Sequence, residues 1–275
     1  SGWGCPVLNN ALLDAMHKLR AVFYCAGSIK GITPEDFWER EIVITSAYAA
    51  NAVPVAEYTL SQILFCLKSG WHHANATKRE HNYSGRYPIH GGYGSTVGII
   101  ALGMVGRKVC ELLKSFDLKV IAYDPFASEE LAAELGVTLC SLEDVFSQSD
   151  VVSLHAPNLP ETKGMIQGRH FEVMRQYSSF INTARGAIVC ENEMIEALKA
   201  RPDIQAVLDV TFPEPPVPES PLYELPNVVL TPHIAGSMGR ECARMGRYMV
   251  DELQRYLRGE KLQWQITREM AKRLA

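Results

Sequence analysis

The sequence lacks the features that mark several large classes of protein. It has no CxxC pair, and its seven cysteines stand singly, mostly among apolar neighbours, as small hydrophobic residues do. It has no excess of basic residues, since its formal net charge is -4, and no apolar run long enough to cross a bilayer. These absences disfavour a disulfide scaffold, a nucleic-acid binder and a membrane protein, and the single thiols indicate a reducing cytoplasm.

Three further patterns are missing: the spacing of zinc ligands, an internal repeat, and a basic and apolar leader in the opening residues SGWGCPVLNN. What is present is a 47% apolar composition over 275 residues, which suffices for a substantial core. We therefore expect two domains, no bound metal, and a small molecule as the partner rather than nucleic acid or a membrane.

Residues 96–230 alternate short β-branched runs with amphipathic stretches. The expected strands are 97–102, 120–123, 151–155, 179–182, 206–210 and 228–230, and the expected helices are 105–115, 129–135, 143–147, 171–175 and 193–199. Several of these strands are apolar on both faces, as strands covered by helices on both sides must be. The pattern predicts an α/β fold with a doubly wound parallel sheet.

The flanking residues hold only a fragment of a second α/β unit. We expect a helix at 11–19, strands at 21–24 and 42–45, a helix opened by Pro54 and running to Gly70, a Gly/Tyr-rich loop at 83–95, and a final helix at 239–258. The predicted domains are 54–235, which would bind a dinucleotide, and a smaller one, 1–53 with 236–275, whose first part is missing.

The stretch TVGIIALGMVG has the order of a dinucleotide-binding turn: a strand, glycines, then a helix. In that turn Gly103 would allow the phosphates to approach, and Gly106 would let the helix pack on the strand. Ala101 replaces the usual first glycine, which we expect to cost one methyl group and a slightly displaced turn. The bland alternative is a glycine-rich turn without a ligand.

Asp124 ends the next strand and can accept hydrogen bonds from the two ribose hydroxyls, which favours NAD over NADP. The alternative is an acid that makes a turn with Pro125. The candidate cofactor residues in this half of the sheet are Ala101, Gly103, Met104, Val105, Gly106, Tyr123 and Asp124.

Polar residues also follow the later strands: Arg185 in INTARG, Asp209 and Glu214 in VLDVTFPEPP, and His233 in LTPHIAG. An arginine can hold a carboxylate through two hydrogen bonds, and a histidine beside a carboxylate can carry one proton near neutral pH. With a nicotinamide they could perform reversible hydride transfer to a 2-oxo acid. Singly, each could instead be a salt bridge, a loop acid or a strand-closing polar residue.

These motifs resemble the D-isomer-specific 2-hydroxyacid dehydrogenase family. The resemblance rests on VGIIALGMVG with YDP, LHAPNLPETKGMI, INTARGAIV, VLDVTFPEPP and LTPHIAG, and it extends over nearly the whole chain. It implies an NAD-dependent enzyme, a dimer formed through the cofactor domain, and a flavodoxin-like substrate domain, of which the usual first strands are absent here.

The resemblance also implies roles. Arg185 would bind the substrate carboxylate and carbonyl, His233 would be the general acid/base, and Glu214 would hold His233. Backbone N–H groups at Gly27, Ser28 and Ile29 would close on the substrate, with a glycine suited to that turn, and Asn51 would begin the hinge. The further cofactor residues would be His155, Ala156, Pro157, Thr183, Ala184, Arg185, Asp209, His233 and Gly236.

Two other functions remain open. The same fold can serve as an NAD(H)-sensing binding protein of the corepressor kind, without turnover. Formate dehydrogenases share the scaffold, but they have Gln at the position of Glu214, which disfavours them. The sequence does not identify the 2-hydroxy acid.

Overall fold

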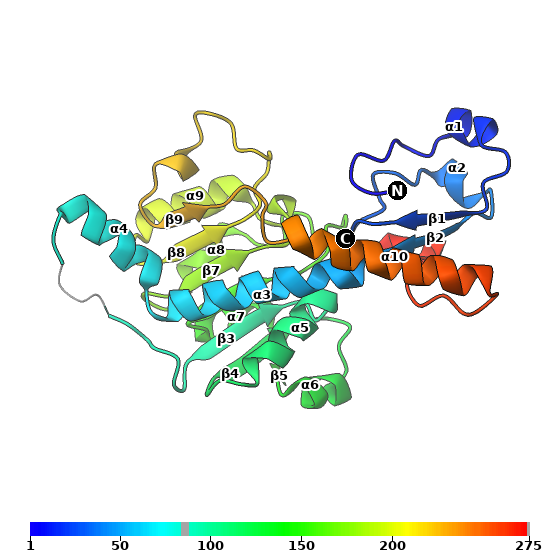
Figure 1. Cartoon of the computed structure of the whole chain (residues 1–275). Helices are drawn as coiled ribbons and strands as arrows, with labels where there is room; N and C mark the ends of the chain where they lie inside the picture. Colours follow the sequence, from blue (N-terminus) through cyan, green and yellow to red (C-terminus); the bar gives the residue numbers. More distant parts are fainter. Residues whose placement is uncertain (84–87, 274–275) are drawn as a thin grey trace. The chain divides into compact units, whose positions relative to one another are not determined.

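The computed structural model describes residues 1–83 and 88–273, and within them the chain forms two compact units. Unit 1 comprises Ser1–Pro54 and Gly236–Ala275, and unit 2 comprises Val55–Ala235. The Gly/Tyr-rich loop expected at 83–95 falls partly on residues 84–87, outside the described residues. Figure 1 shows the chain coloured along the sequence.

The described residues of unit 2 form a parallel sheet of seven strands in the order β5-β4-β3-β6-β7-β8-β9. This arrangement confirms the predicted α/β class with a doubly wound parallel sheet. Successive strands alternate with helices, as Figure 1 shows. The strands are β3 (Thr96–Ile100), β4 (Lys119–Tyr123), β5 (Thr138–Leu139), β6 (Val151–Leu154), β7 (Ser179–Asn182), β8 (Gln205–Leu208) and β9 (Val228–Leu230).

Helices cover both faces of this sheet because neighbouring strand residues point to opposite sides. Val152 and Phe180 pack into one cluster, whereas Val151 and Ile181 pack into the other. The helices on the first face are α7 (Leu142–Gln148), α8 (Gly168–Glu172) and α9 (Glu191–Ala200). Those on the second are the end of α3 (Tyr48–Leu67), α5 (Met104–Leu113) and α6 (Glu129–Leu135).

Unit 1 is built on a two-stranded parallel sheet, β1 (Ala21–Tyr24) and β2 (Val43–Ser46). Met245 and Met249 of α10 pack against Ala47 and Ala50, and the buried Phe37 lies in a second cluster. The remaining helices of this unit are α1 (Asn10–Ala15), α2 (Glu35–Trp38), α10 (Cys242–Leu257) and α11 (Arg268–Arg273).

Helix α3 differs from the prediction that Pro54 opens it. It begins at Tyr48, so Pro54 lies inside the helix. Proline removes one intrahelical hydrogen bond there, but the preceding turn is rich in alanine and Ala50 is fully buried. The packing of that turn therefore outweighs the local preference of proline for a helix start.

Other boundaries also differ. Leu102, His155 and Val210 lie beyond the ends of their strands, and the final helix begins as a 3-10 turn, Gly239–Glu241, before α10. The first helix ends at Ala15 rather than residue 19. The prediction missed β5, which has only two residues, the four-residue α2 (Glu35–Trp38), and α4 (Gly70–Glu80), whose sequence is largely polar.

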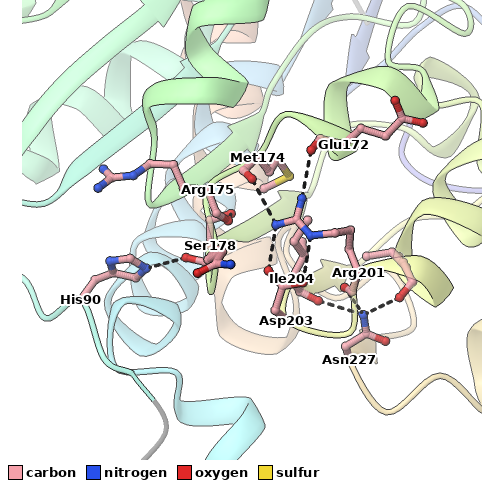
Figure 2. Close-up of polar contacts among 11 residues, drawn as sticks. His90, Glu172, Met174, Arg175, Ser178, Arg201, Asp203, Ile204 and Asn227 are labelled. Atoms are coloured by element: carbon pink, nitrogen blue, oxygen red, sulfur yellow. Dashed lines mark hydrogen bonds and ion pairs between the residues drawn. The ribbon is translucent and has the colours of Figure 1, made fainter.

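A polar cluster lies at the amino ends of β7, β8 and β9 in unit 2 (Figure 2). Arg201 donates to both carboxylate oxygens of Asp203, at 2.8 and 2.9 Å, and to the carbonyls of Glu172 and Met174. The buried Asn227 amide donates to the carbonyls of Leu198, Arg201 and Ile204. We call Arg201, Asp203 and Asn227 the amino-end cluster; it ties the turns before β7, β8 and β9 together.

Candidate functional site

The turn after β3 has the geometry of a phosphate-binding turn. Gly103 is the N-cap of α5, and a Cβ placed on it would meet nothing within 4 Å. A Cβ on Gly106 would lie 2.1 Å from the carbonyl oxygen of Ala101, so that position requires glycine. The open space at Gly103, beside the positive end of α5, fits the pyrophosphate of a dinucleotide.

The backbone conformation of Ala101 differs from the expectation of a slightly displaced turn. Its φ is 73°, in the left-handed region that favours glycine. The cost of replacing the first glycine is therefore backbone strain of about 1 kcal/mol, rather than the volume of one methyl group.

Asp124 follows β4 and holds this turn. Its Oδ2 accepts the N–H of Leu102 at 2.7 Å, and its Oδ1 accepts the N–H of Phe126 at 2.8 Å. The contact with Phe126 is the turn around Pro125 that the bland alternative describes. A carboxylate oxygen can accept a second hydrogen bond, so the same side chain can also receive ribose hydroxyls.

His233 and Glu214 form a pair at the carboxyl ends of β8 and β9. The Nδ1 of His233 lies 2.5 Å from Oε1 of Glu214, and the two side chains are 45% and 40% exposed. An ionised carboxylate can only accept, so Nδ1 carries the hydrogen and Nε2 remains for another partner. His233 has a φ of 53°, which is unusual outside glycine.

Arg185 lies near the Glu214 carboxylate of this pair. Burial lowers the pKa of the Arg185 guanidinium, and the Glu214 carboxylate acts in the opposite direction. One guanidinium nitrogen donates to the carbonyl of Ala184 at 2.6 Å. The structure thus brings Arg185, Glu214 and His233 into one region, and their predicted catalytic roles stay predictions.

The turn that carries Arg185 is fixed by a residue that the sequence analysis did not select. Asn182, 1% exposed, ends β7. Its amide donates to the carbonyl of Arg185 at 3.1 Å and accepts the N–H of Ala184 at 3.0 Å. The position of Asn182 in the sequence could have indicated this role, because a buried asparagine at the end of an apolar strand bonds to nearby backbone groups.

Asp209 is 2% exposed and is occupied by the loop that holds His233. Its carboxylate accepts the Thr231 hydroxyl at 2.6 Å and the N–H groups of Ile234 and Ala235 at 2.9 Å. Its carbonyl accepts the N–H of His233 at 3.0 Å. The structure therefore shows Asp209 orienting this loop, and its predicted contact with the cofactor remains a prediction.

His155 follows β6, and its Nε2 lies 2.9 Å from the Ser153 hydroxyl. Burial lowers the pKa of His155 to about 3, so the ring is neutral at physiological pH. Ala156 is buried and Pro157 half-buried, and the hydroxyl of Thr183 lies 3.2 Å from that of Thr59 on α3. These residues follow β6 and β7 at the same sheet edge, where we predict the cofactor.

In unit 1 the candidate substrate turn is ordered by other contacts. The Ser46 hydroxyl donates to the carbonyls of Ala26 and Gly27, and Ile29 is buried. Gly27 is not among the residues with positive φ, and a Cβ there would meet only the Asn51 amide at 3.6 Å. Neither the conformation nor the space at Gly27 requires a glycine in this structure, and the expected role of the turn in binding the substrate stays a prediction.

Asn51 of α3 accepts the N–H of Ser237 at 2.8 Å, and a Cβ on Gly236 would lie 3.3 Å from its Oδ1. The two chain segments that leave unit 1 are therefore joined beside Asn51, the residue predicted to begin the hinge. Gly236 belongs to unit 1, and its predicted cofactor contact stays a prediction.

Within residues 1–83 and 88–273, no cluster of three or more His, Cys, Asp or Glu side chains could hold a metal ion. None of the helices in those ranges combines the length and hydrophobicity that crossing a bilayer requires.

Residues 61–235 match the model of the D-isomer specific 2-hydroxyacid dehydrogenase, NAD binding domain. The chain is 32% identical over 248 residues to the D-3-phosphoglycerate dehydrogenase of Archaeoglobus fulgidus, an alignment that covers 90% of this chain and 47% of that protein. It thus spans about half the length of such relatives. It is 31% identical to the putative 2-hydroxyacid dehydrogenase YoaD of Bacillus subtilis, covering 84% of this chain and 68% of that one.

Solved structures share the fold. The TT0316 protein of Thermus thermophilus superposes with a TM-score of 0.77 at 28% identity, covering 93% of this chain and 81% of that one. The NAD-complexed D-isomer specific 2-hydroxyacid dehydrogenase of Lactobacillus delbrueckii ssp. bulgaricus gives a TM-score of 0.81, covering 95% and 84%. At 24% identity the second likeness shows the fold alone.

Proposed function

The chain belongs to the D-isomer specific 2-hydroxyacid dehydrogenase family, and from that premise we propose that it interconverts a 2-oxo acid and a D-2-hydroxy acid with NAD(H). The observation that carries the proposal is the 2.5 Å contact between His233 and Glu214, close to Arg185. All three residues follow strands of the sheet that also ends in the phosphate-binding turn. Chemistry in parallel sheets gathers at this edge.

Unit 2 is the cofactor domain in this proposal. The N–H groups at Gly103, Met104 and the start of α5 would hold the pyrophosphate, and Asp124 the ribose. NAD(H), when bound, supplies or accepts the hydride. A carboxylate at the position of Asp124 repels a 2′-phosphate, which favours NAD over NADP.

Arg185 would bind the substrate through its carboxylate and polarise the adjacent carbonyl. Its burial supports this role, because a guanidinium that has lost part of its hydration interacts strongly with an anion. The N–H groups of Gly27, Ser28 and Ile29 in unit 1 would donate further hydrogen bonds to the substrate.

His233 would move the proton. In the reductive direction its Nε2–H donates to the carbonyl oxygen of the substrate, and in the oxidative direction Nε2 takes the hydroxyl proton. Glu214 accepts from Nδ1 throughout, so it fixes the ring orientation and stabilises the imidazolium. Asp209 holds the loop of His233 from behind.

We propose in addition that two copies associate through unit 2, with α3 at the interface. The support is the exposed apolar side chain of Phe65 on α3, together with those of Tyr83, Ile89 and Tyr93 in the segment after α4. The molar mass in solution, by light scattering, tests this. A mass of one chain contradicts it.

A cytoplasmic location is proposed from the thiols. All seven cysteines are free in the structure, and free thiols persist in a reducing compartment. Peptide mass spectrometry of protein isolated from its own cells under alkylating conditions should find each of these seven cysteines alkylated, and disulfides among them would contradict the location.

The decisive experiment is a panel of 2-oxo acids, from glyoxylate and hydroxypyruvate to longer side chains, assayed with NADH and NADPH in parallel. We expect turnover of at least one acid, with NADH preferred. The matched variant is His233→Gln, which should lose most of kcat while still binding NADH. NADH binding without any turnover would instead support the alternative of a sensing protein.

A further inference from the structure

Glu214 lies on a loop with few backbone N–H groups that could donate hydrogen bonds. The segment Phe212–Pro216 contains three prolines, so only Phe212 and Glu214 keep a backbone N–H. The Phe212 N–H donates to Oε2 of Glu191 at 2.9 Å. This contact fixes the loop two residues before Glu214.

The loop also packs closely against the segment that joins β7 to α9. A Cβ on Gly186 would lie 2.0 Å from the carbonyl carbon of Thr211, so the two backbones touch there. The Thr211 hydroxyl donates to the carbonyl of Pro213 at 2.9 Å. Arg185 lies in this segment and Glu191 is the first residue after it, at the start of α9. One short stretch of chain therefore carries the guanidinium and the oxygen that holds residues 212–216, which we call the acid loop.

Glu191 is half-buried at the first position of α9. Burial raises the pKa of its carboxyl group, and the hydrogen bond from Phe212 partly offsets that rise. Burial thus disfavours the charge, whereas the hydrogen bond from Phe212 needs only an oxygen acceptor at that place.

We propose that Glu191 is a positioning residue: its carboxyl oxygen holds the Phe212 N–H and thereby sets where Glu214 meets His233. The inference deepens the proposed function and rests on it. Glu191 does not touch the reacting atoms. It acts through the backbone of residues 212–214.

Glu193 offers a matched control, because it lies in the same first turn of α9. Its Oε2 also accepts a backbone N–H, from Gly168 at 2.8 Å, but that contact joins α9 to α8 and leads away from the acid loop. A role of Glu191 that is merely structural, or due to the charge at the helix start, would be shared by Glu193.

The test compares two substitutions of Glu191: one keeps its oxygen acceptor without the negative charge, and the other keeps the charge but moves the acceptor. Glu191→Gln keeps an oxygen at the same reach and removes the charge, whereas Glu191→Asp keeps the charge and shortens the reach. Positioning predicts that Glu191→Asp loses kcat about tenfold, with little change in the KM for NADH, and that Glu191→Gln stays within about twofold of wild type. A charge effect predicts the reverse order. Glu193→Asp should change kcat by less than about twofold.

Exchange of the Phe212 amide hydrogen, followed by NMR, gives a readout that needs no turnover. It should accelerate in Glu191→Asp and remain slow in Glu191→Gln and Glu193→Asp. If wild type shows no turnover of any 2-oxo acid, the proposed function fails. If wild type is active and Glu191→Asp keeps its kcat, or Glu191→Gln is the more impaired, the positioning role is overturned.

Discussion

The two ends of the larger sheet are both rich in polar side chains, but the two sets are used differently. At the amino ends, Arg201, Asp203 and Asn227 bond to one another and to backbone carbonyls (Figure 2). At the carboxyl ends, Glu214 and His233 touch each other and stay 40% and 45% exposed. Satisfied polar groups stabilise a fold, whereas groups with free capacity can bind and react.

The two arginines make the contrast most clearly. Arg201 donates to both oxygens of Asp203, which raises the pKa of the guanidinium. Burial lowers the pKa of the Arg185 guanidinium. Among the described residues, no carboxylate lies within hydrogen-bond distance of it. A half-buried arginine without a bidentate partner, at the carboxyl end of a sheet, suits an anionic ligand.

The largest expected effect tests this contrast directly. Arg185→Gln should lower kcat/KM for the 2-oxo acid about a thousandfold, or about 4 kcal/mol, because the carboxylate loses its bidentate partner. The free energy of unfolding should not fall. Steady-state kinetics and urea denaturation measure the two quantities. Arg201→Gln is the matched control and should show the opposite pattern, less stability with unchanged kcat/KM; equal loss of activity in both variants would break the comparison.

A second effect belongs to the amino ends. Asn227→Ala should lower the free energy of unfolding by about 3 kcal/mol, because the carbonyls of Leu198, Arg201 and Ile204 lose their donor while buried. Activity measured well below the melting temperature should remain. Thermal and urea denaturation provide the check, and an unchanged midpoint would show that the cluster does not stabilise the fold.

A third effect concerns pH. Burial lowers the pKa of His155 to about 3, whereas an unfolded chain titrates near 6.5. Below pH 6.5 the unfolded state therefore binds a proton that the folded state does not, and stability falls as the pH falls. At pH 5 the loss is about 2 kcal/mol. Urea denaturation at pH 7 and pH 5 should show a smaller difference for His155→Asn than for wild type; equal differences would refute the assignment.

The smallest effect is a gain. Ala101→Gly should raise the free energy of unfolding by about 1 kcal/mol, because glycine adopts the left-handed conformation without strain. Ala133→Gly in the exposed part of α6 is the control and should lose about as much, since glycine weakens a helix. A loss of stability in Ala101→Gly would show that the strain is not released.

Much of this site follows from position in the chain. Arg185 and His233 follow β7 and β9 as expected, because apolar runs bounded by turns mark strands well. Asp209 was expected inside a strand at 206–210, but it follows β8, which ends at Leu208. Parallel strands then place those residues at one edge. The roles of Glu191 and Asn182 could not be predicted in this way, since each depends on which backbone group lies opposite its side chain.

The boundaries of α3 show a different limit. A proline predicts a helix start from local chemistry, but Ala47 and Ala50 pack against Met245 and Met249, almost two hundred residues later in the chain. No local pattern contains that contact. The free energy of the buried turn decides where the helix begins.

The order of apolar runs and glycines, which depends only on neighbouring residues, determined the parallel sheet and the glycine turn that follows β3. Tertiary structure alone decided that Asp209 faces inward to the loop of His233, that Ala101 takes a left-handed conformation, and that Glu191 reaches the acid loop. Those outcomes depend on burial and on hydrogen-bond partners that are distant in sequence, and the free energy of such contacts exists only once the chain has folded.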